Sequence, residues 1–306
     1  MNSFITKLSD ILFNRIKYYN VGIINQNIAD FILDQRKKIF WLNNLNKNTF
    51  IADPFVHEFK SSTYIFVEEY CYSRKKGHIS VIQKLGDKLF SKPVTIIEEE
   101  YHLSYPFIFC YEEKIYCMPE AYKSGETSIY EAIDFPYKWE KKKMVFNEKI
   151  IDPTLIHYKN KWWCFYTLEG NDTANSELHI KYTEDPINGE WKNHKMSPAK
   201  RDIKSSRSAG NFILMNNSIL RPSQDCEKYY GHQISVNKIM DLTESSFEEK
   251  TIKTIHPNKP YLDGFHHISH YNCVIAIDGM KYKYSLKKMN VIIKYLLQKI
   301  TRIHAN

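Results

Sequence analysis

The chain has 306 residues, of which 43% are hydrophobic, 14% aromatic and 25% charged, and its formal net charge is +8 at pH 7. This composition excludes a disordered chain, a collagen-like repeat and a low-complexity linker. Apolar runs such as residues 274–277 fall far short of the ~20 residues that span a bilayer, and no secretory signal pattern is visible at the start. We therefore expect a globular protein of the cytoplasm, at most peripheral on the inner membrane face.

The excess of basic residues lies near the C-terminal end. Residues 281–306 hold seven basic residues and no acidic one, whereas the rest of the chain holds 36 basic and 35 acidic residues. A nearly neutral body argues against a basic groove for nucleic acid, so no nucleic-acid partner is expected. The six cysteines lie far apart and form no CxxC pair, which indicates reduced, buried thiols rather than disulfides or a zinc site.

The sequence begins with an amphipathic pattern. Within residues 2–17, apolar side chains recur on one helical face, namely Phe4, Ile5, Leu8, Ile11, Leu12 and Ile16. This periodicity predicts a helix over residues 1–19. Residues 20–35 follow with an apolar run, which we expect to supply a strand that closes the last unit of the fold.

A pattern of about fifty residues then repeats five times. Each unit starts with a short apolar segment at a turn, and the starts are Asp53, Tyr105, Asp152, Ser208 and Gly264. A strand-like run follows in each unit, at 64–70, 114–120, 161–169, 218–225 and 273–278. Four units add a third alternating run, at 77–82, 128–133, 178–183 and 231–236.

Several β-branched or aromatic strands in each unit, with turns between them, are typical of propeller blades. A helical repeat would show a period of 3.6 residues, which is almost absent between residues 48 and 280. We therefore predict an all-β protein, a five-bladed β-propeller over residues 20–280, with amphipathic helices at the N- and C-termini. A two-sheet sandwich is the alternative fold.

The sequence ends in a second amphipathic pattern, over residues 281–306. Apolar residues recur there at spacings of three and four among the lysines, namely Leu286, Met289, Ile293, Leu296, Leu297, Ile300 and Ile303. Two interpretations stay open, a helix packed on the propeller or a basic helix on an anionic membrane surface.

Carboxylates occupy repeated positions in the apolar segments. Asp53 and Asp152 take matching places at the start of their units, each before a proline. The second runs end in further acids, namely Glu68, Glu69, Glu120, Glu169, Asp225 and Asp278. Inner strands of a propeller meet at its axis, so these groups are expected to converge on one pocket, where burial and mutual repulsion separate their pKa values for acid and base work. The alternative is that Asp-Pro only caps a turn.

Cationic and polar groups accompany the acids. Arg207 and Arg221 suit the oxygens of a diphosphate, because a guanidinium binds phosphate in a bidentate manner, although each could instead be a partner for the ring of acids. Further candidates for binding substrate are His102, Gln224, His266 and Glu69. No helical HxxxH and no glycine-rich phosphate motif occurs in the sequence, so neither a metal nor a cofactor is expected.

The ordered series of motifs resembles a known family. The motifs are IADPF at 51–55, HLSYPF at 102–107, DPT at 152–154, RSAG at 207–210, RPSQD at 221–225 and GFHH at 264–267. Over about residues 20–280 they are similar to the N-terminal domain of glucosamine inositolphosphorylceramide transferase and to bacterial polysaccharide glycosyltransferases, some of them like galactofuranosyltransferases. That domain is in turn similar to the five-bladed propellers of furanosidase-type glycoside hydrolases.

The resemblance implies roles for the acids. In the hydrolases, an Asp of the first blade is the base or nucleophile, a second Asp steadies the transition state, and a Glu is the acid. By position, Asp53 and Asp152 match the two Asp residues. The hydrolases place their Glu in a later blade than the second Asp, so the acid here is either Glu120, which precedes Asp152, or Asp225.

The resemblance also implies a function. It favours a glycosyltransferase that moves a sugar, such as galactofuranose, from a nucleotide sugar to a glycan acceptor in the synthesis of a surface polysaccharide such as O-antigen or capsule. We expect a UDP-sugar donor, a lipid-linked or oligosaccharide acceptor, and contact of residues 281–306 with an anionic membrane. A glycoside hydrolase and a carbohydrate-binding propeller without activity are the alternatives.

Overall fold

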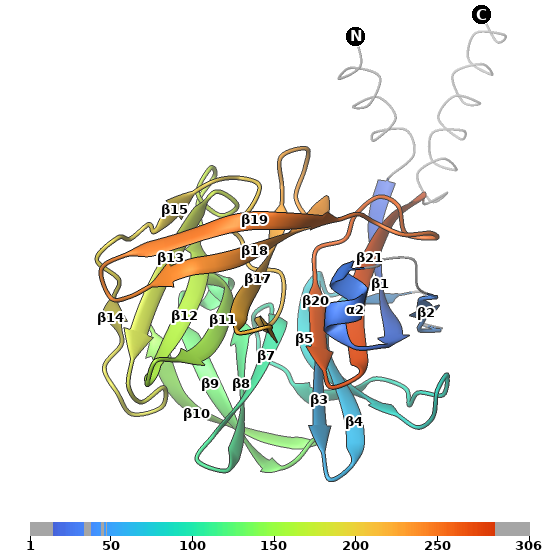
Figure 1. Ribbon diagram of the computed structural model, residues 1–306. Coiled ribbons are helices and arrows are strands. Elements are labelled where there is room, and N and C mark those ends of the chain that lie inside the picture. Colours follow the sequence, from blue (N-terminus) through green and yellow to red (C-terminus); the bar gives the residue numbers. More distant parts are fainter. Residues whose placement is uncertain (1–14, 34–37, 44–45, 47, 285–306) are drawn as a thin grey trace, which may run out of the picture.

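A computed structural model describes residues 15–33, 38–43, 46 and 48–284. Five antiparallel sheets are arranged around an axis like the blades of a propeller (Figure 1), so the predicted all-β fold with five blades is confirmed. The predicted terminal helices lie almost entirely outside the described residues. Where they overlap with them, at residues 15–19 and 281–284, the chain forms strands instead. Within the described ranges, no helix has the length and apolarity needed to cross a membrane.

The first three blades follow one another in the sequence. Blade 1 consists of β3 (Thr49–Phe59), β4 (Ser62–Cys71), β5 (Lys76–Lys84) and β6 (Val94–Ile97). Blade 2 consists of β7 (Ser104–Tyr111), β8 (Lys114–Glu120), β9 (Thr127–Asp134) and β10 (Lys138–Phe146), with the short 3-10 helix η1 (Tyr122–Ser124) between β8 and β9. Blade 3 consists of β11 (Ile150–Tyr158), β12 (Lys161–Leu168), β13 (Glu177–Thr183), β14 (Lys192–Asn193) and β15 (Lys200–Arg201).

The last two blades complete the ring. Blade 4 consists of β16 (Ile213–Met215), β17 (Ser218–Asp225), β18 (Gln233–Leu242) and β19 (Phe247–Ile255). Blade 5 consists of β20 (Ile268–Tyr271), β21 (Val274–Tyr284), β1 (Arg15–Asn25) and β2 (Phe40–Trp41). The strand predicted to close the last unit is therefore present, because β1 pairs with β21 from Arg15–Tyr284 to Asn25–Val274.

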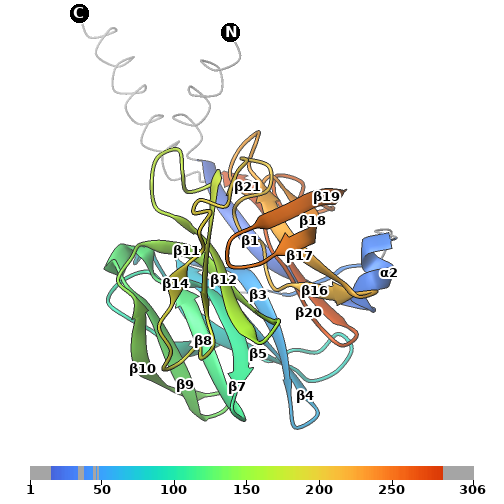
Figure 2. The same ribbon diagram turned by 60° about the vertical axis from the view of Figure 1, so that its left-hand side comes forward.

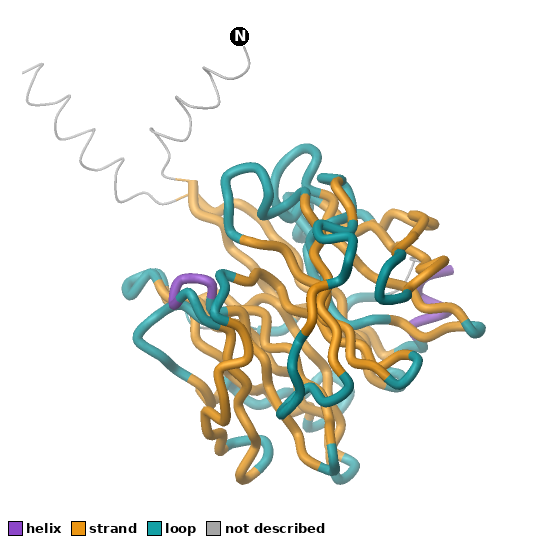
Figure 3. The backbone as a smooth tube through the Cα atoms, turned by 90° about the vertical axis from the view of Figure 1, so that its left-hand side faces the viewer, coloured by secondary structure: helices purple, strands orange, loops and turns teal. Residues whose placement is uncertain are grey.

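Tight hairpins join the first and second strands of the blades. In four of them the two central residues both have positive φ, namely Lys60 and Ser61, Glu112 and Glu113, Lys159 and Asn160, and Asn216 and Asn217. Such turns match the right-handed twist of the paired strands. These hairpins lie at one end of the propeller, here called the hairpin face (Figure 2). The opposite end, where the second strands finish, is here called the site face; longer loops lie there (Figure 3).

The hydrophobic core lies between neighbouring blades. The largest cluster joins blades 1, 2 and 3 through buried rings such as Phe66, Phe107 and Tyr166. A second joins blades 4 and 5, where the short helix α2 (Ile28–Leu33) inserts Phe31 beside Ile277. Each such side chain contributes about 1.5–3 kcal/mol on burial. The packing holds the blades in register, so the inner strands present their side chains to a fixed axis.

Two kinds of strand differ from the prediction. The starts of blades 4 and 5 form only isolated bridges, Ser208 to Ser223 and Gly264 to Met280, before the short β16 and β20. Small and polar residues there offer little apolar surface for a regular inner strand. The outer strands β10 and β19 were not predicted, because exposed lysines and glutamates break the alternation on which a strand prediction depends.

Gly210 is expected to tolerate no side chain. Its φ is +116°, and a Cβ would lie 1.7 Å from the carbonyl oxygen of Ile268 in blade 5. Its N–H also donates to the Tyr105 hydroxyl at 2.8 Å. We expect Gly210→Ala to lower the free energy of unfolding by at least ~2 kcal/mol in chemical denaturation. Gly125→Ala is the matched control, since Gly125 has φ +82° but open space around it; an equal loss in both variants would contradict the steric argument.

Candidate active site

Three inner strands are interrupted by the same β-bulge. In β3, β7 and β11 the pairing shifts at an X-Pro dipeptide whose first residue has positive φ, namely Asp53 (49°), Tyr105 (45°) and Asp152 (49°). Proline is tolerated at a bulge because it has no N–H to lose from the ladder. The positive φ costs each of these residues about 1–2 kcal/mol, and strain of this kind is concentrated at functional sites.

Carboxylates accept hydrogen bonds from the bulged amides. Asp278 Oδ2 accepts from the Asp53 N–H at 3.4 Å, and Glu120 Oε2 accepts from the Asp152 N–H at 3.1 Å. The Tyr105 N–H donates to Asp53 Oδ2 at 3.2 Å. Each of these bonds links one blade to the next. The acids therefore form a ring around the axis and also stabilise the strained backbone.

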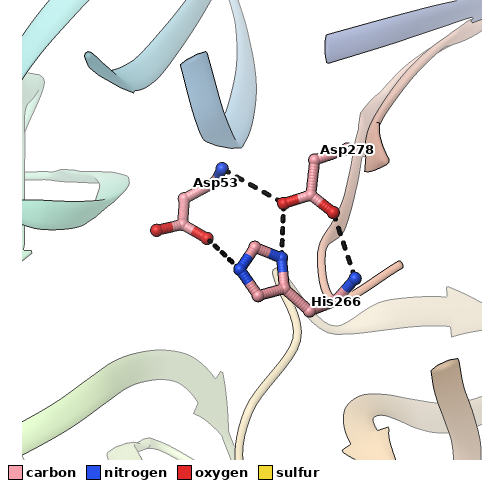
Figure 4. A group of neighbouring side chains, drawn as sticks. All are labelled: Asp53, His266 and Asp278. Atoms are coloured by element: carbon pink, nitrogen blue, oxygen red, sulfur yellow. Dashed lines mark hydrogen bonds and ion pairs between the residues drawn. The ribbon is translucent and has the colours of Figure 1, made fainter. Parts of the chain in front are cut away.

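His266 lies between two of these carboxylates (Figure 4). Its Nδ1 is 2.5 Å from Asp278 Oδ2, and its Nε2 is 3.7 Å from Asp53 Oδ1. Burial alone would lower the pKa of His266, but the negative charges of Asp278 and Asp53 have the larger effect and raise it. Burial would likewise raise the pKa of Asp278, yet His266 and the neighbouring amides hold that pKa below its usual value. The pair is therefore an ion pair, with Tyr19 stacked on the imidazole at 4.8 Å between centroids.

Asp53 is the carboxyl that titrates near neutral pH. Burial raises its pKa to about 7; His266 opposes this shift, whereas Asp152 and Asp278 add to it. Its side chain remains 11% exposed, so a bound hydroxyl can reach it. A carboxyl with these properties suits a general base, because a base works best when its pKa lies close to the operating pH.

Asp152 is fixed by two donors. Its Oδ2 accepts from Arg207 Nε at 2.6 Å and from Gln224 Nε2 at 3.1 Å. The Arg207 guanidinium also lies 3.8 Å from Glu120 Oε2 and 4.7 Å from the centroid of the Tyr230 ring. Burial and the adjacent Asp152 raise the pKa of Glu120 well above its usual value, against the effect of Arg207. The ion-paired Asp152 therefore lies beside a carboxyl, that of Glu120, whose pKa is raised.

Glu68 is a further buried acid of the ring. Burial, together with the other carboxylates of the ring, raises its pKa well above the usual value. His102 Nε2 lies 3.7 Å from Glu68 Oε1, while His102 Nδ1 accepts a hydrogen bond from the Gly77 N–H at 2.8 Å. Burial also lowers the pKa of His102 to about 4. Its neutral imidazole therefore carries the proton on Nε2, 3.7 Å from Glu68 Oε1.

Two pockets open onto the ring from the site face. The first, of 450 Å³, is here called the aromatic pocket, and its lining includes Tyr19, Phe50, Glu68, Tyr70, Tyr72, His102, Tyr230 and His266. The second, of 540 Å³, is here called the polar pocket, and its lining includes Glu120, Tyr122, Glu169, Asn171 and Arg207. Tyr230 belongs to the first pocket and Arg207 to the second, so their stacked pair separates the two.

One group of side chains has the geometry to hold a cation. Ligand atoms of Asp53, His266 and Asp278 all lie within 4.8 Å of one another. The His266–Asp278 ion pair already satisfies two of the three, so a cation would have to displace that pair. The arrangement fits a charge network better than a metal site, and the sequence-based expectation of no metal remains a prediction.

Most of the candidates named from the sequence lie together. The axial ring and its pockets contain Asp53, His102, Glu120, Asp152, Arg207, Gln224 and His266. Three other candidates, Glu69, Asp225 and Arg221, lie elsewhere, and each has partners of its own.

Asp225 and Glu69 point away from the ring. Asp225 accepts hydrogen bonds from Gln233 Nε2 at 2.8 Å and from the Glu227 N–H at 3.0 Å. Glu69 accepts from the Ser80 hydroxyl at 2.9 Å and lines a separate 670 Å³ pocket beside β2 and β5. Side chains alternate between the two faces of a strand, so Gln224 and Glu68, one residue away, face the axis in their place.

Arg221 does not face the pocket either. Its guanidinium is almost fully buried and forms an ion pair of 2.6 Å with Glu249, a residue of the outer strand β19. It also donates to the carbonyl oxygens of Ser205 and Ser206. Four of its five N–H groups donate to these partners. Its acid partner is Glu249 rather than one of the acids of the ring.

Some residues of the site have weak or no sequence signals. Glu68 and Asp278 lie near or at the ends of the second runs predicted from the sequence, but nothing local separates Glu68 from Glu69. Tyr105 occupies the bulge of blade 2 where blades 1 and 3 have Asp, and its Tyr-Pro dipeptide is the signal that could have identified it. Tyr230 lies in the loop between β17 and β18. The sequence of a loop has no periodic pattern, so the position of Tyr230 at the site could not be predicted.

The fold and the buried carboxylates define a five-bladed propeller with an acid-lined axial site. The chain belongs to the family described as glucosamine inositolphosphorylceramide transferase 1, N-terminal, whose model matches residues 41–261. The matched region contains Asp53, Glu120, Asp152 and Arg207. The domain named from the sequence resemblance is thus confirmed.

Two plant proteins named glucosamine inositolphosphorylceramide transferase 1 are similar to this chain. The protein of Oryza sativa subsp. indica is 36% identical over 208 residues, which cover 66% of this chain and 28% of the rice protein. The protein of Arabidopsis thaliana is 32% identical over 212 residues, which cover 66% of this chain and 27% of the Arabidopsis protein. The chain therefore spans little more than a quarter of these relatives. Because they are plant proteins, the bacterial part of the resemblance gains no support from them.

Solved structures show the same fold. Zg3597, a family 117 glycoside hydrolase of Zobellia galactanivorans, matches with a TM-score of 0.56 and 13% identity, over 88% of this chain and 91% of the hydrolase. At this level of identity, the match concerns the five-bladed architecture alone.

Proposed function

We propose that the chain is the catalytic propeller of a glycosyltransferase that moves a sugar from a nucleotide-sugar donor, preferably a UDP-sugar, to a lipid-linked or oligosaccharide acceptor. The family and the transferases among its relatives support this class. The observation that carries it is Asp53, a buried carboxyl with a pKa of about 7 within the axial ring. In its finer form, the proposal names a furanose such as galactofuranose and a surface polysaccharide such as O-antigen or capsule.

The ring can perform each part of such a transfer. Asp53 takes the proton of the acceptor hydroxyl, and the hydroxyl oxygen forms the new bond to the anomeric carbon of the donor. The bond from that carbon to the diphosphate breaks, and its electron pair leaves with the diphosphate. Asp152 and the other carboxylates stabilise the positive charge that develops on the sugar ring. Arg207, at the edge of the polar pocket, faces the negative charge of the leaving group.

The start of blade 4 favours transfer over hydrolysis. Ser208, Ala209 and Gly210 occupy it, and the structure described for this segment holds no carboxyl there. Hydrolysis of a glycoside needs an acid to protonate the leaving oxygen, whereas a diphosphate leaves without a proton when cations neutralise it. Arg207, adjacent to this segment, supplies such a cation.

A glycoside hydrolase of the five-bladed furanosidase type is the second candidate. It is favoured by the raised pKa values of Glu68 and Glu120, because a protonated carboxyl near Asp53 is what a general acid requires. In this version Asp53 activates water, or attacks the sugar, while one of the two glutamic acids protonates the leaving oxygen.

We expect kcat/KM for transfer to rise with pH through about 7, because Asp53 must be ionised to accept a proton and its pKa is raised to about 7. The measurement is the rate of product formation at low substrate concentration between about pH 5.5 and 8.5, which reports the ionisation of the free enzyme. A rate that stays flat over this range would exclude Asp53 as the base.

A ligand screen followed by a transfer assay tests the proposed function. The melting temperature is measured with UDP, other nucleoside diphosphates, their sugar conjugates and free oligosaccharides, since a ligand of the folded state raises it. A shift with one nucleotide and transfer from its sugar conjugate support the transferase. Hydrolysis of an oligosaccharide without any nucleotide effect supports the second candidate. Oligosaccharide binding with neither reaction overturns both.

A further inference from the structure

Strands β1 and β21 extend the propeller on the site face. β21 passes through the ring at Asp278 and ends six residues later, at Tyr284, opposite the start of β1 at Arg15. Figure 1 shows the end of this two-stranded ribbon at the upper right of the molecule, on the side where the longer loops lie. The hairpin turns lie at the other end. A surface that contacts the end of this ribbon therefore also lies in front of the two pockets.

The ribbon carries lysines over aromatic rings. The Lys281 ammonium lies 4.8 Å from the centroid of Tyr261, and that of Lys283 lies 3.0 Å from the centroid of Tyr18. The Lys17 ammonium lies 5.2 Å from the ring of Tyr230, at the aromatic pocket. The nearby acid Asp263 accepts a hydrogen bond from the Tyr282 N–H at 3.1 Å. Lys17, Lys281 and Lys283 therefore bring three positive charges to the ribbon.

The sequence after Tyr284 is also basic, and the site face also has an exposed aromatic side chain. Beyond Tyr284 the sequence adds five basic residues and no acidic one. Tyr229, in the loop that carries Tyr230, is 40% exposed on the site face. Lysine attracts anionic lipid headgroups, and tyrosine is enriched where protein meets the membrane interface.

We propose that the ribbon and the rim of the site face bind the surface of an anionic membrane, so that the aromatic pocket opens towards the lipid headgroups. The occupant is a lipid surface rather than a nucleic acid, because the basic residues lie on one narrow ribbon instead of along a groove. The acceptor would then be met at the membrane surface. This last point rests on the proposed function, whereas the binding itself does not.

Vesicle binding by the full chain tests the proposal. Sedimentation with phosphatidylcholine vesicles is compared with sedimentation when 30% of the lipid is phosphatidylglycerol, and binding only to the anionic vesicles is expected, with loss in high salt. A lysine near such a surface contributes about fivefold to partition. Lys281→Gln with Lys283→Gln should therefore weaken binding about 25-fold.

A matched double variant controls for net charge. Lys60 and Lys159 lie in hairpins on the opposite face, and their ammonium groups also lie over rings, at 5.1 Å from the centroids of Phe59 and Tyr158. Lys60→Gln with Lys159→Gln should leave vesicle binding unchanged. Equal loss in both double variants, or no loss in either, would overturn the proposed surface.

A fluorescent label tests the orientation. Cys110 and Cys273 are the exposed cysteines of the described structure, and both lie next to hairpin turns. A polarity-sensitive label on them should show no change with anionic vesicles. The same label on Lys228→Cys, in the loop before Tyr229 and with Cys110 and Cys273 replaced by Ser, should shift to shorter wavelength. The reverse result would place the pockets away from the bilayer. Both readouts are independent of catalysis, so loss of transfer activity alone leaves them interpretable.

Discussion

Asp53→Asn is expected to lower the rate of sugar transfer by about 10²- to 10⁴-fold, the contribution typical of a general base. The asparagine oxygen can still accept the hydrogen bond from the Tyr105 N–H that Asp53 Oδ2 accepts at 3.2 Å. The ring should therefore stay assembled while the proton acceptor is lost. The measurement is kcat/KM for the donor and acceptor pair found in the ligand screen, together with the melting temperature of the variant.

Asp225→Asn provides the matched control. Asp225 has the same chemistry and is also buried, but it accepts from Gln233 and Glu227 instead of facing the ring. We expect this variant to keep transfer activity within a few-fold of the unmodified chain. If Asp225→Asn lost as much activity as Asp53→Asn, or if Asp53→Asn stayed active, the assignment of the base would have to be given up.

Arg221→Met is expected to lower the free energy of unfolding by about 3 kcal/mol. The substitution leaves Glu249 buried without its bidentate partner, and it removes the donors to the carbonyl oxygens of Ser205 and Ser206. The loss should lie at the lower end of the usual range for a broken buried pair, because Lys200 Nζ stays 3.0 Å from Glu249. Chemical denaturation followed by tryptophan fluorescence measures it.

A second substitution, at Glu249, distinguishes this effect on stability from a role of Arg221 in nucleotide binding. Arg221→Met combined with Glu249→Leu should recover most of the lost stability, since an apolar pair then replaces the ion pair. Nucleotide binding by the double variant should match that of the unmodified chain. Unchanged stability in Arg221→Met together with lost nucleotide binding would instead return Arg221 to the diphosphate site.

The matching positions of Asp53 and Asp152 were predictable because blades 1 and 3 repeat the same sequence pattern. Asp53 and Asp152 lie in matching Asp-Pro dipeptides, and in the structure the same bulge brings both to the axis. Which of two adjacent polar residues faces the axis was not predictable. Glu68 and Glu69, like Gln224 and Asp225, differ only by the alternation of a strand, and a shift of one residue exchanges their faces.

The ion pair of Arg221 with Glu249 also could not be predicted from the sequence. Its partner Glu249 lies on an outer strand whose sequence has no clear pattern, so the pairing depends on a tertiary contact between β17 and β19. A guanidinium suits a phosphate and a carboxylate equally well, and only the folded structure decides between them. The loop that brings Tyr230 over Arg207 likewise has no periodicity from which its path could be derived.

The pairing of β1 with β21 closes the propeller, and it can form only after both strands have been synthesised. During synthesis β1 is made before β21 and pairs only with the short strand β2 until β21 follows, so its other edge stays open until then. Contacts between such distant parts of a chain form slowly, and an unpaired edge can associate with other chains. Because β21 also carries Asp278, the ring of acids and the closed propeller are completed together. A chain that ends before β21 therefore lacks both the pairing that closes the propeller and the complete ring of acids.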